Sequence, residues 1–279
     1  MTVIFDGKAY ASQKEEDLKL RNQELRKKGI IPRLASIIVG DDPSSVLYVN
    51  LKKKAAERVG CELLVVSCEQ SVKIQEVINK IKKYNTDKSV HGIMVQLPLP
   101  EKFSIENREE ILNSIDPKKD VDGLSENSPY LTPTVKAVLA VLTEAKSIIV
   151  RLAFKDRSHK LDNKVVIIGA NGFEGKKILK VLKGLKFKTE GLDRKTKNLR
   201  QKSGSADILI SVTGSPGIIG KDDIKDGAVV IDVGSPKGDV KTDEVINKAA
   251  FLSPVPGGVG PVTIVCLLEN LIGSASNKT

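Results

Sequence analysis

Tyr48 and Lys52 are the residues of this chain whose types and spacing first suggest chemistry. They lie one helical turn apart in the segment VLYVNLKKKAAERV, residues 46–59. At helical spacing they share a face with Ala55 and Val59, whereas the neighbouring lysines point to the opposite face. A lysine on an apolar face extends its amine to solvent, pairs with an acid, or has its pKa lowered by desolvation. The helix alone favours the first outcome, but the last would make Lys52 a general acid or base at neutral pH.

Alternating strands and helices surround this helix. Apolar runs predict strands at residues 32–40, 61–67 and 92–97, and helical patterns occupy residues 15–28, 46–59, 72–84 and 105–115. This order predicts a parallel sheet with right-handed crossovers, in which ligands bind beyond the carboxyl ends of the strands. Gln96 lies at the end of the third run, next to its last residue, so we expect it at the same edge of the sheet as the start of the Tyr48/Lys52 helix.

Residues 116–123 (DPKKDVDG) combine acids, lysines, a proline and a glycine. Asp116-Pro117 and Asp122-Gly123 are ordinary turn dipeptides, so these residues by themselves predict an exposed turn. Thr132-Pro133 then begins a new helix, with threonine as its cap and proline at its first position. We expect this helix to connect the first domain to a second one.

The second domain opens with a strand, Val165–Gly169, followed by a glycine turn and a helix at Lys176–Leu182. In dinucleotide-binding folds such glycines let the backbone approach a pyrophosphate, which the N-terminus of the helix binds. An empty fold of the same shape would carry the same pattern. The candidate cofactor residues of the turn are Gly169, Asn171, Gly172 and Gly175.

A strand at residues 187–192 ends at Asp193, at a suitable distance from the turn for the acid that binds an adenosine ribose. Asp193 would suit the free ribose hydroxyl of NAD. The Arg194 and Lys195 that follow would suit the additional phosphate of NADP. Both residues of the Asp193-Arg194 pair are therefore cofactor candidates.

Further strands at residues 206–213 and 228–234 continue the second sheet. The first of them ends at two more cofactor candidates, Thr213 and Gly214. Residues 251–261 then hold three prolines and three glycines. They form either an irregular loop or backbone that is shaped around a ligand. The apolar helix at residues 262–272 is expected to pack back against the first domain.

Composition narrows the function classes. The chain has 279 residues, of which 40% are hydrophobic, so about two globular domains are expected. A net charge of +10 leaves an acidic partner open, either nucleic acid or a polyanionic small molecule, although interspersed lysines and glutamates are typical of a solvated surface. Aromatic residues make up 4%, which argues against base stacking.

Cysteine and histidine usage gives little support to a metal site or a histidine-based triad. The three cysteines have no metal-like spacing, and there are two histidines. An odd number of cysteines without a signal peptide predicts a reducing cytoplasm. No apolar stretch approaches about 18 residues, so neither export nor a membrane span is expected.

Five ordered stretches resemble the methylenetetrahydrofolate dehydrogenase/cyclohydrolase family. They are Tyr48–Lys52 (YVNLK), Val95–Pro100 (VQLPLP), Lys119–Gly123 (KDVDG), Thr132-Pro133 and Pro254–Pro261 (PVPGGVGP). The resemblance implies an α/β protein with two three-layer α/β domains and a folate cleft between them. Residues 1–131, completed by a C-terminal helix at 262–279, would form the folate domain. Residues 132–261 would form a Rossmann domain for the nicotinamide cofactor.

The resemblance also implies the roles of single residues. Lys52 would be the catalytic lysine, oriented by Gln96, and Tyr48 would stack on the folate. Asp122 would bind the pterin, and the following loop residues would line the pocket: Pro256, Gly257, Gly258 and Pro261. No metal is implied.

The implied activity is NADP-dependent oxidation of methylenetetrahydrofolate to methenyltetrahydrofolate, followed by hydrolysis to formyltetrahydrofolate. These reactions belong to one-carbon metabolism and supply purine biosynthesis. NAD is the second possible cofactor, and a polyglutamated folate would suit the basic surface. The family implies a cytoplasmic homodimer without a nucleic-acid or membrane partner.

The glycine turn departs from the family pattern. The usual Gly-Arg-Ser-x-x-Val-Gly-x-Pro is here GANGFEGKK, residues 169–177, and Glu174 would repel a pyrophosphate unless it points away. Two alternatives therefore stay open. One is a cyclohydrolase whose dehydrogenase half has decayed, and the other is a non-catalytic module that binds nucleotides or nucleic acid through its net positive charge.

Overall fold

The computed structural model describes residues 2–156 and 164–277. The chain divides into two compact units, each with its own parallel sheet. We call Ala11–Pro133 with Ile264–Thr279 the N-terminal unit, and Met1–Tyr10 with Thr134–Thr263 the central unit. Both units are α/β, as the sequence predicts.

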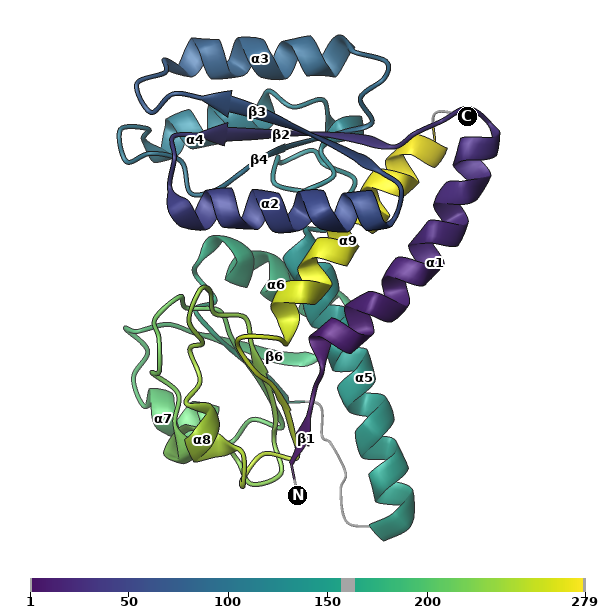
Figure 1. Ribbon diagram of the computed structural model, residues 1–279. Coiled ribbons are helices and arrows are strands. Elements are labelled where there is room, and N and C mark those ends of the chain that lie inside the picture. Colours follow the sequence, from purple (N-terminus) through teal and green to yellow (C-terminus); the bar gives the residue numbers. More distant parts are fainter. Residues whose placement is uncertain (1, 157–163, 278–279) are drawn as a thin grey trace. The chain divides into compact units, whose positions relative to one another are not determined.

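The N-terminal unit is built on a three-stranded parallel sheet of order β3-β2-β4. The helices α2 and α3 lie on its opposite faces (Figure 1). Because both faces are covered, the central strand is an almost continuous buried run, with Ile37 between Val66 and Val95. The strands are β2 (Arg33–Val39), β3 (Glu62–Cys68) and β4 (Gly92–Val95), and the helices are α1 (Gly7–Lys27), α2 (Pro43–Arg58), α3 (Ile74–Thr86), α4 (Ile105–Asn113), η1 (Pro117–Lys119) and α9 (Val259–Ser276).

Helix α9 is long and apolar. It is the one helix within residues 2–156 and 164–277 that reaches the length and hydropathy of a membrane span, with a mean hydropathy of 1.4 over 18 residues. The prediction that no apolar stretch approaches this length is therefore wrong. Its Leu267, Leu268 and Leu271 are at most 1% exposed, and a Cβ on Gly92 of β4 would lie 2.9 Å from a methyl of Leu271. From residue 264 onward, α9 is thus a core helix of the N-terminal unit.

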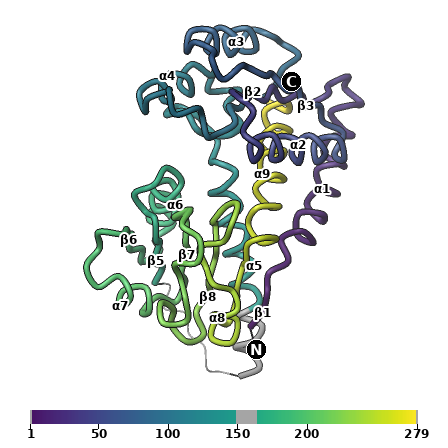
Figure 2. Tube along the Cα trace, turned by 60° about the vertical axis from the view of Figure 1, so that its left-hand side comes forward, coloured from purple at the N-terminus to yellow at the C-terminus, as the bar shows by residue number. Residues whose placement is uncertain are grey.

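The central unit has a six-stranded parallel sheet of order β1-β9-β8-β7-β5-β6. Figure 2 shows β6, β5, β7 and β8 in succession across the unit. The chain runs from β5 outward to β6 and then returns to β7 on the other side of β5, which is the topological switch of a Rossmann sheet. The strands are β1 (Val3–Ile4), β5 (Lys164–Ile168), β6 (Lys188–Leu192), β7 (Ile208–Ser211), β8 (Val229–Asp232) and β9 (Phe251–Ser253). The helices are α5 (Pro133–Asp156), α6 (Phe173–Gly184), α7 (Leu199–Ser203), η2 (Lys221–Asp223) and α8 (Thr242–Val245).

The observed division differs from the expected domains at the N-terminus. Strand β1 pairs with β9. The backbone N of Val3 donates to Ala250 O at 2.9 Å, and the backbone N of Phe5 donates to Leu252 O at 2.8 Å. The first ten residues therefore belong to the central unit rather than to the unit that holds Lys52. Helix α9 also begins earlier than expected, which places Pro261 in its first turn and not in the preceding loop.

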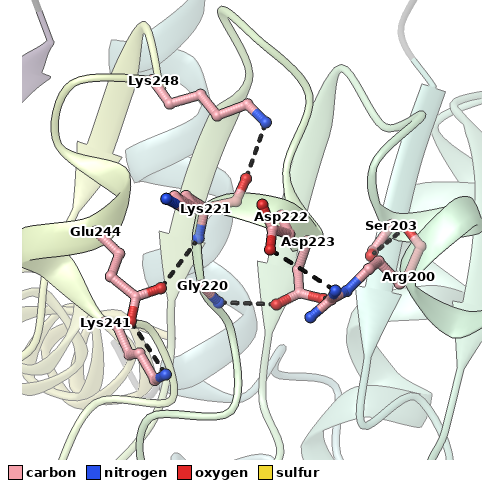
Figure 3. A network of polar contacts seen from close by, with 9 residues as sticks. All are labelled: Arg200, Ser203, Gly220, Lys221, Asp222, Asp223, Lys241, Glu244 and Lys248. Carbon is pink, nitrogen blue, oxygen red and sulfur yellow. Dashed lines mark hydrogen bonds and ion pairs between the residues drawn. The ribbon is translucent and has the colours of Figure 1, made fainter.

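A polar network joins the short helices of the central unit (Figure 3). Arg200 of α7 donates to the Asp223 carboxylate of η2 at 3.2 Å, and the same carboxylate accepts from Gly220 N at 2.9 Å. Glu244 of α8 accepts from Lys221 N at 3.4 Å. The residues drawn all lie outside the candidate cofactor set, so we interpret the network as structural.

Candidate active site

Helix α2 presents Lys52 on its buried face. Asp42 caps the helix by accepting from Ser45 N, and Pro43 occupies its first position, where no intrahelical donor is needed. Val49 and Ala56 are 2% and 0% exposed, one helical turn to either side of the half-buried Lys52. The predicted apolar face is confirmed, and Lys52 is part of it.

The Lys52 amine does not extend to open solvent. Its Nζ donates to Gln96 Oε1 at 2.9 Å and lies 3.8 Å from Met94 Sδ. Burial lowers the pKa of the Lys52 amine below its ordinary value of 10.5, and the negative charge of Asp122 opposes this shift. A lowered pKa increases the fraction of neutral amine, which is the form that accepts a proton as a general base.

Gln96 holds the amine in place. It follows β4, where its backbone N donates to Ile37 O at 2.8 Å and so continues the sheet ladder. Its side chain is 8% exposed, and its Nε2 donates to Leu97 O at 2.7 Å. That bond fixes the amide so that Oε1 faces Lys52. The sequence places Gln96 at this edge correctly, and the structure adds the direct contact.

The segment Lys119–Gly123 is not the exposed turn that its composition predicts. Lys119 is 4% exposed and donates to Tyr84 O and Asp87 O, both at 2.7 Å. Asp120 is fully buried and accepts from the backbone N and the hydroxyl of Ser125 at 2.8 and 2.6 Å. These two residues shape the loop. The half-buried Asp122 is the acid of the segment whose charge acts on Lys52.

Met94 and Asn270 contribute to this site and were missed by the sequence reasoning. Met94 lies two residues before Gln96, so the alternation of a strand already places both on one face. Asn270 of α9 donates to Val121 O at 2.9 Å and to Leu131 O at 3.1 Å, and so fixes the loop on either side of Asp122. Nothing in the local sequence marks Asn270, because its partners are more than a hundred residues away.

Tyr48 lies one turn before Lys52 on α2 and is half-buried. The structure therefore groups Tyr48, Lys52, Gln96 and Asp122 in the N-terminal unit. The stacking role of Tyr48 and the pterin role of Asp122 stay predictions.

The glycine turn of the central unit closes tightly at the carboxyl end of β5. Gly169 has φ +87°, and a Cβ there would lie 2.5 Å from Val212 O at the end of β7. A Cβ on Gly175 would lie 2.1 Å from Gly169 O. Gly172 is the N-cap of α6, which leaves the first N–H groups of the helix directed at the turn. The turn has the backbone cradle and helix terminus that a pyrophosphate requires.

Asp193 lies beside this turn, directly after β6. Its Oδ2 accepts from the side-chain amide of Asn171, and its Oδ1 accepts from Lys195 N at 2.8 Å. Arg194 and Lys195 are exposed. The structure therefore brings the turn residue Asn171 and the acid Asp193 together, as expected of one cofactor site.

Two buried acids support the Thr213-Gly214 segment after β7. The Asp239 carboxylate accepts from Ser211 Oγ and from Thr213 N, both at 2.7 Å. The carboxylate of the neighbouring Asp232 accepts three hydrogen bonds, from the backbone N–H groups of Gly234, Asp239 and Val240. Burial raises the pKa of Asp232, the three hydrogen bonds oppose this, and the charge of Asp239 raises it further. These acids were also missed by the sequence reasoning.

The proline- and glycine-rich loop belongs to the central unit up to residue 263. Val255–Pro256 is a cis peptide, and Gly257 has φ +98°. Gly258 has no room for a side chain, because a Cβ would lie 2.3 Å from Ser253 Oγ. The loop therefore requires glycine at positions 257 and 258. Pro256, Gly257, Gly258 and Pro261 all lie in a different unit from Lys52.

Two protein-family models match the chain. The tetrahydrofolate dehydrogenase/cyclohydrolase catalytic domain matches residues 5–122, and the NAD(P)-binding domain of the same family matches residues 143–279. The first match contains Tyr48, Lys52, Gln96 and Asp122, and the second contains the glycine turn and Asp193.

Individual relatives match over the whole chain. The bifunctional protein FolD of Lactococcus lactis subsp. cremoris is 37% identical over 291 aligned residues, which cover 99% of this chain and 97% of the relative. The crystal structure of the bifunctional enzyme FolD, a methylenetetrahydrofolate dehydrogenase/cyclohydrolase, from Campylobacter jejuni has a TM-score of 0.88 at 36% identity and covers 100% of both chains. The structure of the Trypanosoma brucei methylenetetrahydrofolate dehydrogenase-cyclohydrolase (FolD), complexed with NADP cofactor and inhibitor, has a TM-score of 0.86 at 29% identity. The superposition covers 99% of this chain and 98% of the Trypanosoma brucei chain.

Proposed function

Because this chain belongs to the tetrahydrofolate dehydrogenase/cyclohydrolase family, we propose that it oxidises methylenetetrahydrofolate with NADP and hydrolyses the methenyl product to formyltetrahydrofolate. The observation that carries the proposal is the buried Lys52 amine, held at 2.9 Å by Gln96 Oε1. NAD is the alternative cofactor. The enzyme would serve one-carbon metabolism and purine biosynthesis.

Lys52 performs the proton chemistry of the hydrolysis. The methenyl group is a cation, and a cation beside the amine favours its neutral form, as burial already does. The neutral amine accepts a proton from water while the water oxygen bonds to the methenyl carbon and the C=N electron pair moves to nitrogen. One C–N bond of this adduct then breaks to leave the formyl group, and the nitrogen that leaves takes up a proton. Gln96 keeps the amine directed at that water. Asp122 accepts hydrogen bonds from the pterin, and Tyr48 stacks on the folate.

The dehydrogenase half relies on the glycine turn. Bound NADP supplies the acceptor for the hydride that leaves the methylene carbon. Gly169, Gly172 and Gly175 fit a dinucleotide, because side chains at the first and last of them would collide with the backbone and Gly172 caps α6. Glu174 lies in the first turn of α6, where the helix dipole favours an acid, which supports a structural role for it.

Three further features are part of the proposal. The net charge of +10 supports binding of polyglutamated folates. The three cysteines lie within the part of the chain that the structure describes and are buried thiols rather than disulfides, which suits a reducing cytoplasm. Family habit supports a homodimer, and we include neither nucleic acid nor membrane among its partners.

The decisive experiment compares the Lys52→Met variant with Lys53→Met. Lys53 is the exposed neighbour of Lys52 on α2 and serves as the control position. Hydrolysis of methenyltetrahydrofolate, followed by its absorbance, should fall by about 10²- to 10⁴-fold in Lys52→Met, because that is the usual contribution of a general base. The Lys53→Met variant should hydrolyse methenyltetrahydrofolate at the rate of the unaltered protein. Unaltered hydrolysis in both variants would contradict the proposal.

Glu174 and the altered turn motivate a second candidate, a cyclohydrolase whose dehydrogenase half has decayed. Reduction of NADP by methylenetetrahydrofolate distinguishes the two functions. Retained hydrolysis without reduction of either NADP or NAD would favour the second candidate. A salt-sensitive affinity for oligonucleotides, with hydrolysis unaffected by Lys52→Met, would favour a nucleic-acid-binding module instead.

A further inference from the structure

Asp122 lies in a tight turn that is tied to the sheet of the N-terminal unit. Ile93 of β4 forms a parallel bridge with Asp120, so the turn starts at a fixed point of the sheet. Gly123 N donates to Asp120 O at 3.1 Å, which closes a four-residue turn with Asp122 at its third position. Gly123 has φ +66°, and a Cβ there would lie 2.6 Å from Tyr130 O. The turn is therefore fixed at its start and closely packed at its end.

Asn270 of α9 holds the middle of this turn. It is 5% exposed, and its Nδ2 donates to Val121 O at 2.9 Å and to Leu131 O at 3.1 Å. The Val121 carbonyl belongs to the planar peptide group that leads directly into Asp122, so the hydrogen bond restricts the rotation of that group. The second bond ties the end of the loop to the same amide. One side chain of the C-terminal helix thus clamps the chain before and after Asp122.

Apolar packing keeps α9 aligned with the turn. A Cβ on Gly92 of β4 would lie 2.8 Å from a methyl of Val121 and 2.9 Å from a methyl of Leu271. Val121 and Leu271 are both fully buried, so both side chains pack over the same glycine. Leu271 directly follows Asn270 along the chain. A shift of the helix would therefore disturb this packing together with the hydrogen bonds of Asn270.

The carboxylate that the turn carries acts on the Lys52 amine. Burial lowers the pKa of Lys52, and the charge of Asp122 opposes this shift. From the β4 side, the amine meets the uncharged Met94 Sδ and Gln96 Oε1, and α2 itself presents the Tyr48 phenol one turn before the lysine. The attraction between Asp122 and Lys52 falls as their separation grows. A looser turn would thus weaken the charge that favours the ammonium form.

We propose that Asn270 is a positioning residue for the proton transfer at Lys52, because it holds the peptide group that keeps the Asp122 carboxylate beside the amine. The inference rests on the proposed hydrolysis for its consequence in catalysis. It adds a residue of the last helix, which reaches Lys52 only through Asp122. Without the Asn270 amide, the carboxylate relaxes toward solvent and the amine loses a proton more readily.

The test follows the titration of Lys52 by NMR in the full-length protein with ¹³C at the lysine Cε atoms, and the Lys52→Met variant identifies the signal. In Asp122→Asn, the ratio of neutral to charged amine at a given pH should rise about tenfold, the smaller effect of losing a neighbouring opposite charge. In Asn270→Ala it should rise about twofold or more, as is usual for coupled groups of one network. Asn270→Ala should add nothing in the Asp122→Asn background, and by itself it should move the rising limb of the hydrolysis pH profile to lower pH.

Ser274→Ala is the matched control. Ser274 is 2% exposed, lies one turn after Asn270 on α9 and donates to Lys118 O at 3.0 Å, ahead of the bridge at Asp120. Its loss should lower the stability toward urea but leave the titration of Lys52 in place. Asn270→Ser, a milder change that keeps a hydroxyl donor, should shift the titration in the same direction as Asn270→Ala and by less.

Two results would overturn the inference. One is an unmoved titration of Lys52 in both Asn270 variants, and the other is a further shift when Asn270→Ala is combined with Asp122→Asn. The titration does not depend on turnover. A shifted titration in a protein that fails to hydrolyse methenyltetrahydrofolate would therefore refute the proposed function and leave the positioning of Asp122 by Asn270 intact.

Discussion

Gln96→Glu is the substitution that probes the catalytic lysine most directly. It is nearly isosteric, and it replaces the neutral Oε1 that lies 2.9 Å from Lys52 Nζ by a carboxylate oxygen. Burial lowers the pKa of Lys52 in the unaltered protein, whereas an adjacent anion favours the ammonium form and raises it. The substitution therefore opposes the environment that makes Lys52 a base.

The size of the effect follows from Coulomb's law. At the 2.9 Å separation, the attraction between two unit charges is about 1.4 kcal/mol at a dielectric constant of about 80 and about 6 kcal/mol at about 20. The lower value already reduces the fraction of neutral amine about tenfold. Hydrolysis of methenyltetrahydrofolate at neutral pH should fall by at least that factor, and the rising limb of its pH profile should move to higher pH.

The assay is the initial rate of methenyl hydrolysis across a pH series, with thermal melting as a check on folding. Gln75→Glu is the control, because Gln75 is an exposed residue of α3 and the same charge is added there. It should leave both the rate and the profile unchanged. A Gln96→Glu profile that stays in place, or moves to lower pH, would refute the assignment of Lys52 as the base.

Three further predictions concern the parts that support the two sites. Gly175→Ala should abolish coenzyme binding and lower the melting temperature, because its Cβ would lie 2.1 Å from Gly169 O; the measurements are a coenzyme titration and calorimetry. Asn270→Ala leaves two carbonyls without their donor and should cost about 1–3 kcal/mol in the free energy of unfolding, measured with urea. The pKa of Asp232 is raised in the folded state above its ordinary value of 3.8, so the folded state binds more protons than the unfolded state. The contribution of this bound proton to the free energy of unfolding is therefore lost as the pH rises above 3.8. The stability of the unaltered protein relative to Asp232→Asn should thus decline with pH above that value, and a difference that stays constant or grows would contradict the assigned shift.

The residues of the lysine site were predictable where local periodicity carries the information. Helical spacing puts Lys52 on the apolar face of α2, and the end of an apolar run puts Gln96 at the ligand edge of the sheet. Composition was misleading for Lys119 and Asp120, which look like turn residues but are buried. Their partners, Tyr84 O, Asp87 O and Ser125, become visible only when the loop is folded against its neighbours.

Long-range pairing accounts for the other differences. A two-residue strand such as β1 has no periodicity of its own, and its assignment to the central unit depends on β9, more than two hundred residues later. The buried acids Asp232 and Asp239 likewise stand alone in apolar or glycine-rich sequence. These acids matter because their carboxylates accept hydrogen bonds from backbone N–H groups, and a pattern of side-chain types does not predict such bonds.

The position of Gly92 against α9 has a consequence for the order in which the protein forms during synthesis. Strand β4 leaves the ribosome long before Leu271, yet a methyl of Leu271 would lie 2.9 Å from a Cβ at Gly92 and so borders that space together with Val121. Ser274 likewise donates to His91 O at 2.7 Å. The nascent N-terminal unit therefore exposes this surface of β4 until residues 264–277 emerge. The whole central unit has then been synthesised, so the unit that carries Lys52 acquires its full core only after the coenzyme turn has been made.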